Sequence, residues 1–155
     1  MNAPTAIEDS ITISAPRTEV FRALTDPDRL ARWMATSVES EPRTGGRFRY
    51  SFEFEDASQN NVQQGEYIEI VSDERVVLPW TFPFSPAQTQ VEYTLREAGE
   101  GTEVAFRHSG FGSGEPWDQA RERFTGGWRM FLEGLKTSVE EGTEAHPLGM
   151  KGASR

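Results

Sequence analysis

The fold of this chain is decided near its C-terminal end, where residues 115–141 have the sequence EPWDQARERFTGGWRMFLEGLKTSVEE. The large apolar residues of this stretch recur at steps of three, four or seven, which places them on one face of an α-helix. They are Trp117, Phe124, Trp128, Phe131, Leu135 and Val139. The pattern predicts one helix from Glu115 to Glu141, ~37 Å long, which can cross an entire sheet.

The sequence before this helix alternates with a period of two, which is typical of strands with one buried face. Strands are predicted over residues 8–14, from Gly45 onward, over 63–71 and 75–82, and over 88–96 and 102–109, the last two as a hairpin. The positions predicted to face inward are Phe48, Tyr50, Phe52, Phe54, Val76, Leu78, Trp80, Phe82, Val91, Tyr93, Leu95, Val104, Phe106 and His108.

Prolines mark two short helices and two irregular places. Pro16 and Pro27 each stand where a helix begins, and Asp26 is the expected N-cap of the second helix, which carries Trp33. Pro79 indicates an edge position or a bulge, and residues 82–86 contain too much proline for a ladder and are predicted as a loop. The order of elements predicts an α+β domain with connected antiparallel strands and no βαβ crossover.

The composition excludes several classes of function. The chain of 155 residues has no cysteine, and its 16 basic and 25 acidic residues give a net charge of −9. Such a surface repels nucleic acid and anionic lipid, and without cysteine there is no thiolate metal site or disulfide. We therefore expect no nucleic-acid partner, no membrane insertion, no metal and no cofactor. Because the first residues lack the pattern of a secretory signal, we expect a cytoplasmic location.

A set of short motifs resembles the SRPBCC superfamily, also called START-like or helix-grip. The branch is similar to the domain of activators of the heat-shock-protein-90 ATPase, and the nearest part of that branch is bacterial and uncharacterised. The motifs are Ile13-Ser14-Ala15-Pro16, residues 20–27, Trp33, Gly45-Gly46-Arg47-Phe48, residues 65–70, Trp80, His108-Ser109-Gly110-Phe111, and Gly127-Trp128 with Leu132 and Leu135. The resemblance covers residues 9–141. It leaves residues 1–8 as an N-terminal extension and residues 142–155 as a tail that we expect to be flexible.

The resemblance implies a curved antiparallel sheet of six or seven strands around the long C-terminal helix, as in the birch-pollen allergens, with a cavity between sheet and helix. Superfamily members bind lipids, sterols, polyketides or hormones there, so the first hypothesis is that this protein binds a small hydrophobic or amphipathic molecule. A stress-related role is part of this hypothesis. The candidate cavity-lining residues are Trp33, Tyr50, Phe52, Trp80, Tyr93, Phe106, His108, Phe124, Trp128 and Phe131. The alternative is that the aromatic rings fill a closed core, in which case interaction through the outer surface becomes the better account.

Two other hypotheses stay open. A polyketide cyclase or dehydratase would use His108 with Tyr50 or Tyr93 as acid–base groups, although no catalytic residue is assigned. A protein-interaction module would use the outer face of the sheet and includes chaperone regulation. The resemblance does not carry a chaperone partner over, because the further N-terminal domain of the eukaryotic activators is not in this sequence. A homodimer is left open.

Three features have competing interpretations. His108 is a core histidine bonded to backbone or tyrosine, a ligand contact, or a general base. Gly126-Gly127 costs about 1 kcal/mol per glycine relative to alanine inside a helix, which favours close packing of another backbone over a kink. The loop Gly110–Gly114 lacks the order of a phosphate loop and is predicted to be a lid or hinge at the helix entrance.

Overall fold

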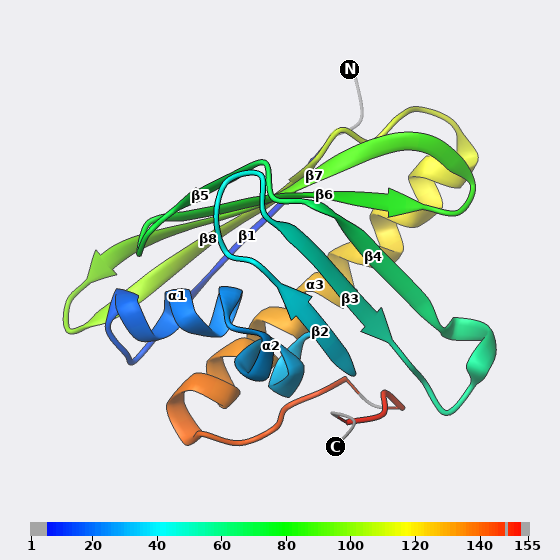
Figure 1. Cartoon of the computed structure of the whole chain (residues 1–155). Coiled ribbons are helices and arrows are strands. Elements are labelled where there is room, and N and C mark those ends of the chain that lie inside the picture. The colour runs from blue at the N-terminus through cyan, green and yellow to red at the C-terminus, as the bar shows by residue number, and fades with distance from the viewer. Residues whose placement is uncertain (1–5, 148, 153–155) are drawn as a thin grey trace.

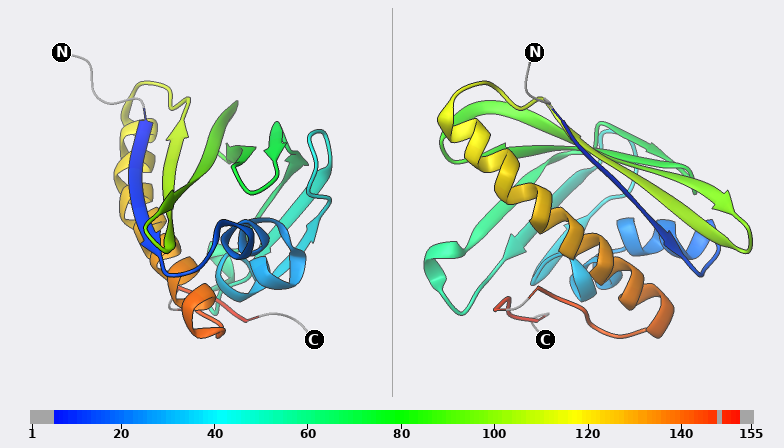
Figure 2. Two further views of the ribbon diagram at one scale, coloured as in Figure 1. Left: turned by 90° about the vertical axis from the view of Figure 1, so that its left-hand side faces the viewer. Right: turned by 180° about the vertical axis from the view of Figure 1, so that it is seen from behind.

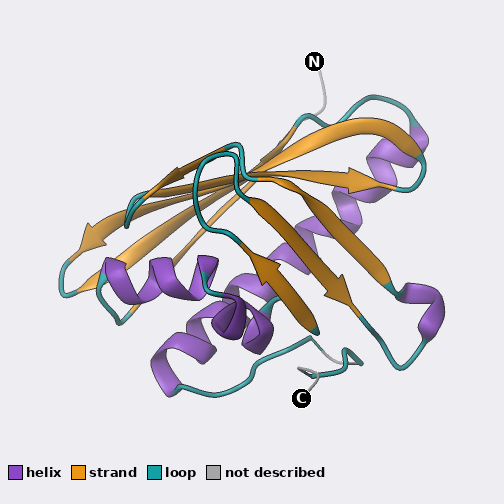
Figure 3. Ribbon diagram, viewed as in Figure 1, coloured by secondary structure: helices purple, strands orange, loops and turns teal. Residues whose placement is uncertain are grey.

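The computed structural model describes residues 6–147 and 149–152, and within them the chain is an α+β fold, as predicted (Figures 1 and 3). Three α-helices, one short 3-10 helix (η1) and eight strands occur in this part of the chain. In chain order they are β1 (Ala6–Ile13), α1 (Arg17–Thr25), α2 (Pro27–Trp33), β2 (Ser37–Ser40), β3 (Arg47–Phe52), η1 (Ala57–Gln59), β4 (Asn61–Glu66), β5 (Glu69–Val71), β6 (Arg75–Phe82), β7 (Ser85–Ala98), β8 (Gly101–Ser109) and α3 (Glu115–Glu141).

The strands form two antiparallel sheets. One has the order β1-β8-β7-β6-β5 and the other has the order β2-β3-β4. The two sheets stand opposite each other, with α1 and α2 between their lower ends (Figure 2, left). Helix α3 runs diagonally across the sheets and lies in front of them in the view from behind (Figure 2, right). It packs alongside β1, where Arg129 pairs with Asp9 at 3.3 Å and Lys136 donates to the Thr12 carbonyl oxygen at 2.7 Å. The core therefore lies between the sheets and the inner face of α3.

The starts of the short helices follow the predicted signals. Pro16 stands at the N-cap of α1, and the Asp26 carboxylate accepts a hydrogen bond from the Asp28 N–H at 3.0 Å at the start of α2. Pro27 occupies the first turn of α2, where its missing N–H costs nothing. The hairpin between β7 and β8 also forms where predicted, with Ala98 paired to Gly101.

The strand pattern differs from the prediction in three places. The predicted strand over residues 63–71 is two strands in different sheets, because the chain crosses between sheets at Tyr67 and Ile68. The predicted loop over residues 82–86 is a tight hairpin in which Phe82 pairs with Ser85 and only Pro83 and Phe84 connect the strands. Strand β2 was not predicted. The described strands therefore number eight, not six or seven.

Strand β6 has two neighbours besides β7, namely β5 and β4, and Pro79 lies beyond the end of its pairing with β5. Strand β5 pairs with β6 only from Arg75 to Val77, so Pro79 lies where no strand continues on that side. A register shift between Thr81 and Phe82 follows. The predicted edge position and irregularity are both found. Beyond β5 the neighbour of β6 is β4, and the contact between them is made by side chains.

Helix α3 runs without a break from Glu115 to Glu141, as predicted, and Trp128 is buried against the five-stranded sheet. The expectation of close packing at Gly126-Gly127 is wrong. A Cβ atom placed on either glycine would meet no atom within 4 Å, so no other backbone approaches there. The close approach occurs instead at Gly134, where an added Cβ would lie 2.6 Å from the Ala145 carbonyl oxygen.

The two ends of the described chain make defined contacts. Strand β1 begins at Ala6, within the predicted extension, and pairs with β8 from Ser109 to Thr102. After α3, the Ala145 N–H donates to the Arg32 carbonyl oxygen at 2.7 Å, and the Lys151 N–H donates to the Glu53 carbonyl oxygen at 2.8 Å. The described residues of the predicted tail therefore lie against α2 and the end of β3. The flexibility that we expect of this tail stays a prediction. Residues 1–5, 148 and 153–155 are outside the described part.

Candidate functional site

Most of the predicted cavity-lining residues form one aromatic cluster between the sheets and α3. Trp128 is at its centre, with its ring centroid 4.7 Å from that of Phe106 and 5.0 Å from that of Trp80. Phe52 reaches the cluster from the three-stranded sheet, 5.9 Å from Trp80. Phe131 contacts Phe52 and Trp128, Tyr93 contacts Phe106, and Phe124 contacts His108. Phe124 and Phe131 are partly exposed, and the others are buried.

His108 is held by hydrogen bonds on both ring nitrogens. The Trp128 indole N–H, which can only donate, donates to Nδ1 at 3.0 Å. The proton of the neutral ring must therefore be on Nε2, which donates to Thr89 Oγ1 at 2.6 Å. The Thr89 hydroxyl in turn donates to the Trp80 carbonyl oxygen at 2.7 Å. Burial lowers the pKa of His108 to about 3, so the ring is neutral at neutral pH.

The hydrogen bonds of His108 bear on two of its interpretations, the core histidine and the general base. It is a core histidine bonded to side chains, although its partners are a threonine and a tryptophan and not the backbone or a tyrosine. A general base needs a free nitrogen facing a reacting proton. In this arrangement neither nitrogen is free, because Thr89 and Trp128 occupy both.

A second polar group lies on the opposite wall. Tyr50 and Tyr67 share a hydrogen bond between their hydroxyl oxygens at 2.8 Å, and Tyr67 is also 2.6 Å from the Ser40 hydroxyl oxygen. Burial raises the pKa of Tyr50, of Tyr67 and of Tyr93 above the ordinary tyrosine value. The phenols are therefore protonated near pH 7 and are hydrogen-bonding groups, not bases.

Two buried polar atoms of the cluster have no partner among the described residues. They are the indole Nε1 of Trp80 and the hydroxyl oxygen of Tyr93. Trp80 faces Phe52 of β3, and Tyr93 lies close enough to Tyr67 for the two phenols to interact electrostatically. Both atoms thus belong to the layer between the two sheets. Leaving such a group unpaired costs about 1–3 kcal/mol.

Trp33 is not part of this cluster. Its indole N–H donates to the Ala23 carbonyl oxygen at 2.8 Å, so the ring fastens α2 to α1. Trp33 is fully buried and belongs to the same continuous hydrophobic core, yet no aromatic pairing joins it to the cluster. Among the ten candidates, Trp33 is the one whose polar atom bonds the backbone of the neighbouring short helix.

Several residues of the cluster were not predicted as site residues. Thr89 lies two positions before Val91 on β7, so the alternation of that strand already indicates an inward position. Phe82, Phe111 and Trp117 extend the cluster past His108, and Gly112 lies so close to Trp117 that an added Cβ would meet its ring at 2.5 Å. The loop predicted as a lid is therefore packed against the cluster at Phe111 and Gly112.

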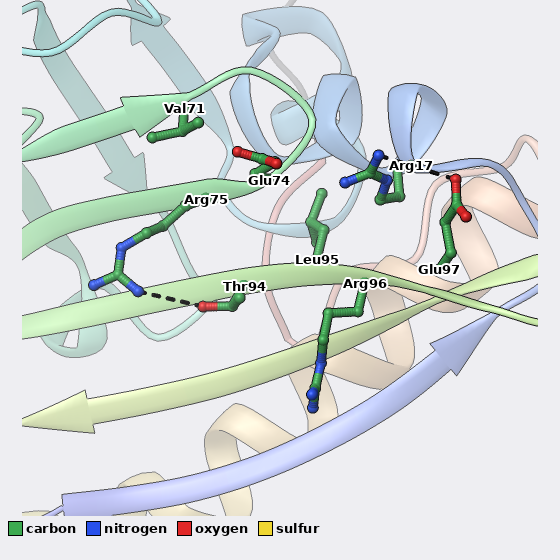
Figure 4. A pocket seen from close by; sticks show the side chains of 8 residues that line it. All are labelled: Arg17, Val71, Glu74, Arg75, Thr94, Leu95, Arg96 and Glu97. Carbon is green, nitrogen blue, oxygen red and sulfur yellow. Dashed lines mark hydrogen bonds and ion pairs between the residues drawn. The ribbon is translucent and has the colours of Figure 1, made fainter.

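Two surface hollows lie away from the cluster. One, of about 520 Å³, is bordered by Arg17 of α1 and by the β5–β6 turn and β7, where Arg75 donates to Thr94 at 3.4 Å and Arg17 pairs with Glu97 at 3.9 Å (Figure 4). The other, of about 660 Å³, lies over β2, β3 and β4 around Arg47 and Arg49. None of the ten predicted residues lines either hollow.

The described residues hold no group of three or more histidine, aspartate or glutamate side chains arranged to bind a metal ion. Of the helices in residues 6–147 and 149–152, none has the length and apolar character that a membrane span requires.

Both the sequence and the fold have relatives among known proteins. Residues 14–140 match the family described as Activator of Hsp90 ATPase homolog 1-like protein. The chain belongs to this family. The predicted resemblance to the SRPBCC superfamily, in its Hsp90-activator-like branch, is thereby confirmed. No curated protein matches the sequence.

Solved structures share the fold of this Hsp90-activator-like chain. Protein MLL2253 from Mesorhizobium loti is 23% identical with a TM-score of 0.74, over 88% of this chain and 97% of that one. The Aha1 dimer from Colwellia psychrerythraea is 21% identical with a TM-score of 0.73, over 90% and 98%. CalU16 from Micromonospora echinospora is 27% identical with a TM-score of 0.70, over 86% and 73%. The helix-grip architecture is thus confirmed.

Proposed function

We propose that this protein binds a small, largely apolar molecule in the layer between its two sheets and α3. The observation that supports this proposal is the pair of buried polar atoms, Trp80 Nε1 and Tyr93 Oη, that have no partner among the described residues. Native proteins pair almost all such atoms, because an unpaired one lowers the stability of the fold. A ligand with its own polar atoms would supply the missing partners.

The surroundings of these atoms suit an apolar ligand. Phe52, Phe106 and Trp128 border them, and ligand sites are mostly apolar with a few placed polar groups. The rings contact one another, so a ligand must displace some of them. Separation of the sheets offers a route. Strands β4 and β6 belong to different sheets and are joined through the Gln63 side chain, which bonds both backbone groups of Thr81.

Binding fits the site better than acid–base catalysis does. His108 uses both nitrogens within the fold, and the phenols of Tyr50 and Tyr93 have raised pKa values. A cyclase or dehydratase mechanism that relies on His108 or Tyr50 would first have to break the hydrogen bonds that hold these two side chains. The proposal therefore assigns no catalytic residue.

The test is a screen of long-chain alcohols, sterols and aromatic polyketides by thermal shift and tryptophan fluorescence. A binder present at 100 times its Kd should stabilise the fold by about 2.7 kcal/mol. Trp80→Phe removes the indole N–H together with part of a buried ring system, so it should weaken binding and also lower stability. Trp33→Phe is the matched control, because it removes a paired indole N–H and should lower stability while leaving affinity unchanged.

Either of two results would contradict the proposal. One is that no compound of the panel binds the wild-type protein. The other is a crystal structure in which ordered water bonds both Trp80 Nε1 and Tyr93 Oη, since water would then be the missing partner.

A further inference from the structure

The layer between the sheets contains no side chain that is ionised at neutral pH. Among the described residues, the buried polar side chains other than tyrosine and tryptophan are Thr25, Thr36, Gln63, Thr89, Thr102, His108 and Ser138. In the part of the chain that the structure describes, no aspartate, glutamate, lysine or arginine is buried. His108 is the one of these that could carry a charge, and burial lowers its pKa to about 3. A ligand in this layer thus meets no cation and no anion.

An ionised carboxylate would be poorly accommodated there. Removing a carboxylate from water is costly unless a cation or several hydrogen-bond donors compensate it. His108 cannot compensate, because Trp128 and Thr89 occupy both of its nitrogens. The chemistry of the layer therefore disfavours free fatty acids and other carboxylates at neutral pH.

The unpaired atoms specify what the ligand must offer. The indole N–H of Trp80 can only donate, so its partner must be an acceptor. The Tyr93 hydroxyl can donate or accept. The hydroxyls of Ser40, Tyr67 and Tyr50 form a chain in which three protons serve two hydrogen bonds, so one proton remains free to donate. Trp80 Nε1 is thus the group among these that can only donate, and an acceptor oxygen on the ligand would match it.

We propose that the ligand of this site is an uncharged molecule whose carbonyl or ester oxygen accepts a hydrogen bond from Trp80 Nε1, and that the site discriminates against carboxylates. This inference rests on the proposed function, because it names the chemical class of ligand for the same site. Trp80 is then the residue that determines specificity for the oxygen atom.

The experiment uses matched probes that differ in one group: 2-acetonaphthone, methyl 2-naphthoate, 2-naphthoate and 2-ethylnaphthalene, together with decanoate and methyl decanoate. Binding to the full chain is measured by isothermal titration calorimetry at pH 7.5. The ketone and the esters should bind about tenfold more tightly, or more, than the matching carboxylates. Between pH 7.5 and 5.5 the apparent affinity of each acid should rise about tenfold per pH unit, because its neutral fraction rises by that factor.

The variant Trp80→Phe tests the specific contact. It should lower the affinity for 2-acetonaphthone by a larger factor than the affinity for 2-ethylnaphthalene, which has no acceptor, so that the difference between the two probes disappears. Carboxylates that bind as tightly as their esters at pH 7.5 would overturn the inference and leave the proposed function standing. If none of these probes and none of the compounds of the wider panel binds, the proposed function itself fails.

Discussion

The indole N–H of Trp128 donates to Nδ1 of His108 at 3.0 Å, and this contact fixes which nitrogen of the histidine carries the proton. Trp128 comes from α3 and His108 from β8, so the bond also ties the long helix to the second strand of the five-stranded sheet. Together with the bond from Nε2 to Thr89, it makes the neutral ring part of the folded structure. Protonation of His108 would place a second proton on Nδ1 and break the bond to Trp128.

Stability should therefore fall as the pH falls. The pKa of His108 is about 3 in the folded protein and near 6.5 in the unfolded chain, so the unfolded state takes up the proton first. The contribution is complete above about pH 6.5 and is lost progressively toward pH 3, with a slope of about 1.4 kcal/mol per pH unit. Urea unfolding at pH 5, 6 and 7 measures it. His108→Gln should flatten the slope by that amount, and equal slopes in both proteins would contradict the assignment.

Tyr93 and Tyr50 should respond oppositely to the same substitution. The Tyr93 hydroxyl is buried without a partner among the described residues, so Tyr93→Phe should raise the stability of the ligand-free protein by about 1 kcal/mol or more. Tyr50→Phe removes the bond to Tyr67 and should lower stability by about 1 kcal/mol. Urea unfolding of both variants makes the comparison. A loss at Tyr93 equal to that at Tyr50 would mean that the Tyr93 hydroxyl has a partner after all.

The glycines of α3 provide a third prediction. Gly126 and Gly127 lie in a continuous helix with open space around them, so alanine at either position should stabilise the protein by about 0.5–1 kcal/mol. Gly134→Ala is the control, because its Cβ would lie 2.6 Å from the backbone oxygen of Ala145 and should be destabilising. Thermal unfolding of the three variants tests this. A destabilising Gly127→Ala would show that another part of the molecule approaches this face in solution.

Local periodicity was sufficient to predict α3 and the inward faces of β3, β6, β7 and β8. The apolar stripe from Trp117 to Val139 has one consistent period, and the bounds Glu115 and Glu141 are those observed. The same reasoning failed for residues 63–71, because the polar Gln63 is buried while the apolar Ile68 is exposed. The burial of Gln63 depends on its hydrogen bonds with Thr81, which lies 18 residues later in the chain, and no local sequence pattern reveals that pairing.

The candidate site was likewise only partly predictable from the sequence. The alternation of β7 placed Tyr93 inward and implied Thr89, but it could not show that Thr89 and Trp128 would occupy both nitrogens of His108. Nor could it show that Trp33 has a local backbone partner whereas Trp80 has none. Parity along a strand specifies the direction of a side chain, and hydrogen-bond partners depend on which strands and helices meet.

Gln63 provides the last prediction, because its side chain takes the place of a strand ladder. Its Nε2 donates to the Thr81 carbonyl oxygen and its Oε1 accepts from the Thr81 N–H, each at 2.9 Å, so that one amide pairs with the backbone of β6 as a neighbouring strand would. Gln63→Ala should leave both Thr81 groups without these partners and lower stability by about 1–3 kcal/mol. Gln64→Ala, at the exposed neighbouring position, should change stability by less than about 0.5 kcal/mol.

Hydrogen exchange measures the local effect of the Gln63→Ala substitution on the Thr81 backbone. In Gln63→Ala the Thr81 amide should exchange faster, whereas the amides of Leu78 and Val91 within the β6–β7 ladder should keep protection in proportion to global stability. If the sheets separate along β4 and β6 to admit a ligand, Gln63→Ala should also raise the association rate measured by tryptophan fluorescence. Unchanged Thr81 protection would show that the Gln63 side chain does not close this boundary in solution, and the route between the sheets would lose its physical basis.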